Sequence, residues 1–67
     1  MNINLNNRPE TFSEEKLTIN QLLEIKNYTF KMLVIKVNGK LVKKDSYNKF
    51  EIIDNDDVTV LHLVSGG

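Results

Sequence analysis

The dipeptide Asn38-Gly39, set between two short apolar runs, is the feature that most restricts how this chain can fold. A two-residue type I′ turn needs positive φ at both central residues, and asparagine followed by glycine meets that need best. Residues 32–37 before the dipeptide place aliphatic side chains in phase opposite Lys36, and Lys40-Leu41-Val42 follows it. The sequence therefore predicts an antiparallel hairpin over residues 32–42.

A helix start precedes this hairpin. Thr18 stands three residues before Gln21, which is the spacing of a capping box, where each side chain bonds to the backbone N–H of the other residue. An apolar stripe that includes Leu22 and Leu23 follows, and Asn27 can end the helix in the left-handed conformation. We predict one helix of about ten residues, which can cover one face of a small sheet.

The N-terminal residues predict a first hairpin. Residues 1–6 alternate apolar and polar side chains, as a strand does when one face packs on a core and the other meets water. Asn6-Asn7-Arg8-Pro9 supplies a turn, and residues 10–12 can return as an antiparallel partner. Farther along the chain, residues 45–53 are expected to be irregular and Asp54-Asn55-Asp56 to form a tight turn.

Residues 58–64 form the last expected strand, and both of its faces are largely apolar, which is typical of a strand with neighbours on both sides. The order hairpin, helix, hairpin, irregular link and strand indicates an α+β layer fold. If the helix covers one face of the sheet, the end of this strand leaves an apolar patch on the other face. We predict that Leu61, Leu63, Val64 and Ser65 dock a partner there.

Composition limits the classes of function. Sixty-seven residues allow one domain with a small core and leave little room for an internal active site. The net charge of zero gives no general attraction to nucleic acid or to an anionic membrane, and the absence of cysteine excludes disulfides and zinc-thiolate sites. No apolar run approaches the length of a membrane span, so we expect a cytoplasmic protein. The single histidine, His62, has no nucleophile placed beside it by sequence and is interpreted as non-catalytic.

The final Ser65-Gly66-Gly67 carries the clearest functional signal. Glycine has no Cβ, so two terminal glycines can pass through a narrow slot and present the α-carboxylate of Gly67 at its far end. That carboxylate is ionised at neutral pH and unreactive until a partner converts its oxygen into a leaving group. We therefore expect residues 1–64 to form the folded body and residues 65–67 a flexible tail. We infer that the chemistry takes place on this carboxylate and that its activation comes from outside the chain.

Taken together, these patterns resemble the ThiS-like sulfur carriers of thiamine thiazole biosynthesis, a family of ubiquitin-like β-grasp proteins. The resemblance covers nearly the whole chain and lies in Ile3-Asn4-Leu5-Asn6, residues 17–24, residues 37–42, Tyr47, Asp54-Asn55-Asp56 and Val64-Ser65-Gly66-Gly67. Three positions depart from the family pattern: Tyr47 replaces a common Trp, Lys43 a common Pro, and Asn55 the usual Gly. The resemblance implies a mixed sheet of four to five strands with one main helix on one face.

The resemblance also implies a reaction cycle. A ThiF-like activating enzyme would adenylate the Gly67 carboxylate with ATP and Mg²⁺, and Gly66 would share the narrow approach. A sulfur donor such as a cysteine desulfurase would then convert the acyl-adenylate to a thiocarboxylate. A ThiG-like thiazole synthase would take the sulfur. The chain itself is expected to bind no cofactor, metal, nucleic acid or membrane.

Two alternatives remain open from the sequence. The same fold and tail could serve as a molybdopterin-synthase small subunit or as a ubiquitin-like modifier. A β-grasp interaction or RNA-binding module could instead use the basic residues Lys36, Lys40, Lys43 and Lys44. Single-strand recognition requires stacking aromatics among such residues, and only Tyr47 is near them.

Overall fold

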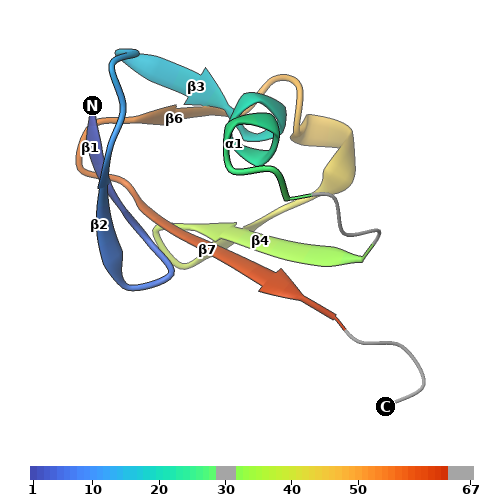
Figure 1. Ribbon diagram of the computed structural model, residues 1–67. Coiled ribbons are helices and arrows are strands. Elements are labelled where there is room, and N and C mark those ends of the chain that lie inside the picture. The colour runs from blue at the N-terminus through green and yellow to red at the C-terminus, as the bar shows by residue number, and fades with distance from the viewer. Residues whose placement is uncertain (29–31, 64–67) are drawn as a thin grey trace.

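The structure is a computed structural model and describes residues 1–28 and 32–63. Its elements are β1 (Asn2–Leu5), β2 (Arg8–Thr11), β3 (Lys16–Thr18), α1 (Ile19–Ile25), β4 (Leu33–Val37), β5 (Lys40–Val42), the 3₁₀ turn η1 (Lys44–Ser46), β6 (Glu51–Ile53) and β7 (Asp57–His62). Five strands form a sheet in the order β2-β1-β7-β4-β5, and β3 pairs with β6 in a separate two-stranded sheet. β1 and β7 run parallel, while the other pairs are antiparallel, and α1 lies over one face of the larger sheet (Figure 1). The predicted α+β class and the central place of the last strand are confirmed.

Both predicted hairpins form, and in both of them asparagine adopts the positive φ that the turn requires. Asn38 and Gly39 have φ values of 53° and 81°, as a type I′ turn requires. Asn6 and Asn7 have φ values of 52° and 65°, so the first turn also needs only two residues. β2 therefore begins at Arg8, and the prediction of a four-residue turn reaching Pro9 was wrong.

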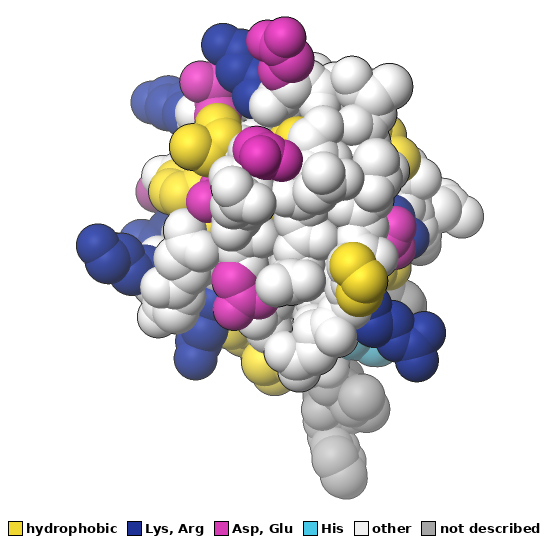
Figure 2. Space-filling model, turned by 90° about the vertical axis from the view of Figure 1, so that its left-hand side faces the viewer, with side chains coloured by type: hydrophobic (Ala, Val, Ile, Leu, Met, Phe, Trp, Pro, Cys, Tyr) yellow, Lys and Arg dark blue, Asp and Glu magenta, His cyan; other side chains and the backbone are white. Residues whose placement is uncertain are grey.

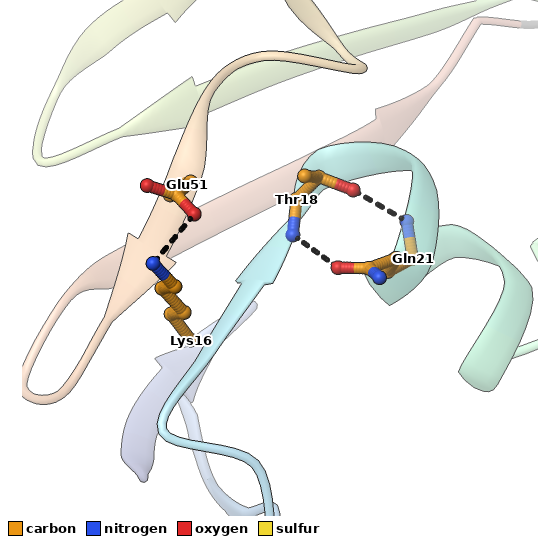
Figure 3. A network of polar contacts seen from close by, with 4 residues as sticks. All are labelled: Lys16, Thr18, Gln21 and Glu51. Carbon is orange, nitrogen blue, oxygen red and sulfur yellow. Dashed lines mark hydrogen bonds and ion pairs between the residues drawn. The ribbon is translucent and has the colours of Figure 1, made fainter.

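The residues predicted to cap the helix, Thr18 and Asn27, do so, but the helix between them is shorter than predicted. The backbone N–H of Gln21 donates to Oγ1 of Thr18 at 3.2 Å, and the backbone N–H of Thr18 donates to Oε1 of Gln21 at 2.8 Å, which is the expected capping box (Figure 3). At the other end Asn27 has φ 57°, and the N–H of Tyr28 donates to the carbonyl of Leu23 at 2.8 Å. This left-handed termination limits α1 to seven residues instead of ten.

The small sheet of β3 and β6 was not predicted. Leu17 pairs with Ile52, both are buried, and Nζ of Lys16 lies 3.3 Å from Oε2 of Glu51 on the exposed side (Figure 3). The passage over residues 45–53 is thus not wholly irregular, since η1 begins it and β6 ends it. This second sheet anchors the start of α1, because the N–H of Ile19 donates to the carbonyl of Phe50 at 3.2 Å.

The core lies between α1 and the sheet face that the helix covers. Its buried members are Ile3, Leu5, Leu17, Ile19, Leu22, Ile35, Val37, Val42, Tyr47, Ile52, Val58 and Val60. Burial raises the pKa of the Tyr47 hydroxyl, because the charged phenolate is disfavoured away from water. A part-buried polar contact supports β7 within this layer: the N–H of Val60 donates to Oδ1 of Asn6 at 2.8 Å. Asn6 thereby extends the parallel pairing of β1 and β7 beyond the end of β1.

The C-terminal end of α1 is tied to the β2 edge of the sheet by an ion pair. Nζ of Lys26 donates to Oε1 of Glu10 at 2.6 Å, and this hydrogen bond with the Glu10 carboxylate raises the pKa of Lys26. The contact fixes the helix across β1 and β2. Within residues 1–28 and 32–63, no helix has the length and apolar character needed to cross a membrane.

Candidate functional site

An apolar patch lies on the sheet face that the helix leaves uncovered, near the end of β7. Successive side chains of a strand point to opposite faces, so the buried Val58 and Val60 place Leu61 on the open face. Leu61 pairs with Val34 of β4, and the N–H of Leu63 donates to the carbonyl of Met32 at 3.0 Å. The pairing brings side chains from two strands together at this end of the sheet.

A residue of β5 belongs to the same face. Leu41 pairs with Lys36, which in turn pairs with Thr59 of β7, so the three residues form one row across the open face. We define the apolar patch by its four exposed large side chains: Met32 (50% exposed), Leu41 (60%), Leu61 (49%) and Leu63 (45%). Exposed large apolar side chains that gather on one face of a sheet are typical of sites of protein interaction.

Other surfaces of the molecule are different. The side that carries β1 and β2 shows mainly polar side chains and charges of both signs (Figure 2). Lys36, Lys40, Lys43 and Lys44 lie on or beside β4 and β5, next to the apolar patch. Tyr47, the one aromatic residue that the sequence places near these lysines, is only 8% exposed, so its ring is not available to a base.

The predicted site residues fall into two groups. Leu61 and Leu63 are exposed beside β4. The face of β7 that carries them is therefore the face open to solvent. Val64, Ser65, Gly66 and Gly67 lie outside the described residues, so their predicted roles stay predictions. The proposed boundary between body and tail at residue 64 lies outside them too. His62 shares the face of Val58 and Val60 but is itself exposed.

Sequence reasoning missed two members of the apolar patch, Met32 and Leu41. Leu41 could have been found, because a two-residue turn at Asn38-Gly39 fixes its pairing with Lys36, a residue assigned to the polar side. Met32 depends on the pairing of β4 with β7, which no local pattern reveals.

Neither a metal centre nor a phosphate loop is seen in the described part of the chain. Residues 1–28 and 32–63 contain no group of three acidic or histidine side chains able to hold a metal ion. Within the same ranges the single glycine, Gly39, lies in a hairpin turn with positive φ and open space around the position of a Cβ. The apolar patch lies at the end of the described chain, four residues before the terminal Gly67.

Comparison with known proteins agrees with the fold and with the sequence pattern. The family model described as "ThiS family" matches residues 3–67. The chain belongs to the ThiS family. A curated member, the sulfur carrier protein ThiS of Bacillus subtilis (strain 168), is 26% identical over 65 residues, which cover 97% of this chain and 98% of that protein.

Two solved structures share this ThiS-family fold. The crystal structure of the thiamine biosynthesis protein ThiS from Geobacter metallireducens matches with a TM-score of 0.87 and 26% identity, over 100% of both chains. A solution structure of a thiamine biosynthesis protein from the same organism matches with a TM-score of 0.81 and 25% identity, over 100% of this chain and 88% of the other. The expected ubiquitin-like β-grasp fold, with five strands in its main sheet and one helix, is confirmed.

Proposed function

We propose that this ThiS-family chain is a sulfur carrier of thiamine biosynthesis that holds sulfur on its C-terminal carboxylate. In this proposal a ThiF-like enzyme adenylates Gly67 with ATP and Mg²⁺, and a sulfur donor such as a cysteine desulfurase converts the adenylate to a thiocarboxylate. A ThiG-like thiazole synthase then takes the sulfur. The observation that carries the proposal is the family match, which runs to the terminal Gly67.

The chemistry divides between carrier and partners. Attack of sulfur on a carboxylate requires loss of an oxygen, and adenylation turns that oxygen into part of a good leaving group, AMP. The thiocarboxylate keeps the acyl carbon of Gly67 and gains sulfur in place of one oxygen. The carrier supplies the acyl group and the docking face, while the partners supply ATP, sulfur and catalytic groups.

The short tail makes docking of the folded body necessary. Residues 65–67 can extend at most about 10 Å when fully stretched, at about 3.3–3.6 Å for each residue. The body must therefore sit at the mouth of the activating pocket for the carboxylate to reach inside. The apolar patch includes the last described residue, Leu63, and so lies where this contact is needed.

The direct test of the carrier function is intact-protein mass spectrometry. The full chain is expressed together with the activating enzymes of its own cell, and the mass of the C-terminal peptide is measured. We expect a species in which one oxygen is replaced by sulfur at Gly67.

Co-purification distinguishes the alternative classes. A thiazole synthase bound to the chain supports the thiamine pathway, whereas a bound molybdopterin-synthase large subunit or lysine-linked adducts would place the chain in one of the alternative classes. A chain that stays wholly unmodified beside an active activating enzyme contradicts the proposal.

Docking through the apolar patch gives a second prediction. Replacing Leu61 or Leu63 by aspartate should weaken binding to the activating enzyme about tenfold or more, because a buried apolar contact becomes a desolvated charge. The measurement is the dissociation constant from calorimetry. Ile25→Asp is the matched control, since Ile25 on α1 is also 49% exposed but lies outside the patch. Unchanged affinity in single aspartate variants at Leu61, Leu63 and Val64 would refute the docking role.

A further inference from the structure

The two edge strands of the main sheet differ in whether their outer backbone groups can pair. β2 and β5 form the edges. In an antiparallel hairpin with a two-residue turn, hydrogen-bonded pairs alternate with non-hydrogen-bonded pairs, starting from the pair that closes the turn. Val37 and Lys40 close the second hairpin, so the next pair, Lys36 with Leu41, is not hydrogen-bonded. The N–H and carbonyl of Leu41 therefore point away from β4 and out of the sheet.

The corresponding position at the other edge is blocked by proline. Leu5 and Arg8 close the first hairpin, and the next pair is Asn4 with Pro9. The same alternation holds farther along these strands, where the N–H of Phe12 donates to the carbonyl of Met1 at 2.9 Å. Pro9 thus occupies a position whose N–H would face outward, and proline has no N–H to offer. Pro9 therefore interrupts the row of outward N–H groups at the β2 edge, whereas Leu41 keeps its outward N–H at the β5 edge.

A groove with a volume of about 610 Å³ runs along the open edge, between β5 and β6. Three large apolar side chains on its walls are exposed: Leu41, Phe50 and Ile53. A segment that paired with Leu41 would lie beside these side chains and could bury its own apolar residues against them. Backbone pairing with apolar contacts on alternate side chains is the usual mode by which a sheet edge binds an extended peptide.

The uncompensated charge along this groove is positive. Lys40 and Lys43 line it, and Lys44 follows directly. Within residues 1–28 and 32–63, the salt bridges are formed by other lysines and leave these three without an acidic partner. The groove carries two acidic side chains as well, Glu51 and Asp56.

Both acidic groups of the groove are already engaged. Oε2 of Glu51 lies 3.3 Å from Nζ of Lys16. The Asp56 carboxylate accepts a hydrogen bond from Nδ2 of Asn38 at 3.0 Å and another from the N–H of Ile53 at 2.9 Å. Lys16 offsets the charge of Glu51, whereas the donors to Asp56 are neutral groups and leave its charge in place. The three lysines therefore outnumber the one carboxylate beside the groove that has no cationic partner.

We propose that the edge of β5 binds an extended acidic segment of a partner protein, which pairs with the backbone of Leu41 and adds a strand to the sheet. A second copy of this chain fits less well, because self-pairing would bring two lysine-rich edges of the same charge together. This interaction does not use the carboxylate of Gly67. Because Leu41 also belongs to the apolar patch, the test below uses a peptide alone, without the activating enzyme, so that its outcome does not depend on the proposed carrier cycle.

The proposal is tested on the full-length chain by NMR titration with a blocked heptapeptide of alternating valine and glutamate. The Leu41 amide should shift and become protected from hydrogen exchange, and binding should weaken as salt is added. The matched probe, in which lysine replaces glutamate, should not bind. Equal binding of both peptides, or binding that leaves the Leu41 amide exchanging freely, would overturn the proposal.

Two substitutions at Leu41 separate the backbone from the side chain. Leu41→Pro removes the outward N–H without removing a bond to β4, as Pro9 does at the other edge, and should lower peptide affinity at least about tenfold, or about 1.4 kcal/mol. Leu41→Ala keeps the N–H and should lose less. Equal losses in both variants would assign binding to the side chain and reject strand addition.

If Leu41→Pro does not fold, hydrogen exchange of the Leu41 amide in the unaltered chain decides whether the peptide pairs with the backbone. A dimer of the free chain that Leu41→Pro dissociates would show self-pairing and also overturn the proposal.

Discussion

Removing Gly67 is expected to abolish thiocarboxylate formation while leaving the fold and its stability unchanged. The shortened chain still ends in a carboxylate, but the reactive carbon is withdrawn by one residue, about 3.3–3.6 Å. A displacement of this size carries the carboxylate out of reach of the activated phosphate, because attack requires reacting atoms about 3–3.5 Å apart. The measurement is the fraction of sulfur-loaded chain by intact mass, together with ATP-dependent adenylate formation.

Gly66→Trp should have the same effect for a different reason, since its side chain cannot pass the narrow slot that a glycine pair fits. Gly39→Ala is the glycine control: it lies in the hairpin turn at φ 81°, with open space around a Cβ. It should cost about 1 kcal/mol of stability, because alanine disfavours the left-handed region, and should leave loading intact. Ordinary loading of the chain without Gly67 would end the carrier interpretation.

Leu22→Ala is expected to destabilise the fold strongly. Leu22 is fully buried and is one of two fully buried residues on α1. Truncation of a buried leucine costs about 2–5 kcal/mol, through lost transfer free energy and the cavity left behind. At about 0.05–0.15 kcal/mol per residue, a chain of this length has a stability of about 3–10 kcal/mol. The substitution therefore removes a large share of the free energy of unfolding.

Urea denaturation followed by circular dichroism measures this loss. Glu24→Ala is the matched control, because Glu24 lies on the same helix but is exposed, and it should change stability by no more than about 0.5 kcal/mol. Equal midpoints for the Leu22 and Glu24 variants would mean that the packing of α1 contributes little to the fold.

Local patterns predicted the elements whose signals lie within a few residues. The turn at Asn38-Gly39 and the capping box of Thr18 and Gln21 require particular residue types at fixed spacing, and both are present as predicted. β3 and β6 have only three residues each, which is too short for a periodic pattern. Their pairing depends on burying Leu17 against Ile52, residues 35 positions apart, and local sequence does not report such a contact.

The candidate site was predictable in part. Period-two alternation placed Leu61 and Leu63 on one face of the last strand, but it could not say which face the helix would cover. That choice depends on the parallel pairing of β1 with β7, which turns the side of Val58 toward the core. Met32 joined the patch only through pairing between strands that are distant in sequence.

The central strand of the main sheet, β7, is also the last strand in the sequence. β7 is the strand that joins the hairpin β1–β2 to the hairpin β4–β5. Until β7 has left the ribosome, the two hairpins stay separate, and an isolated hairpin is only marginally stable in water. The nascent chain can therefore close its sheet only after residues 57–62 have emerged. In the proposed carrier cycle the carboxylate of Gly67 is activated, so a translation product that stops before this strand would lack both the native sheet and that group. Incomplete chains should then be recognised by proteases and not compete for the activating enzyme.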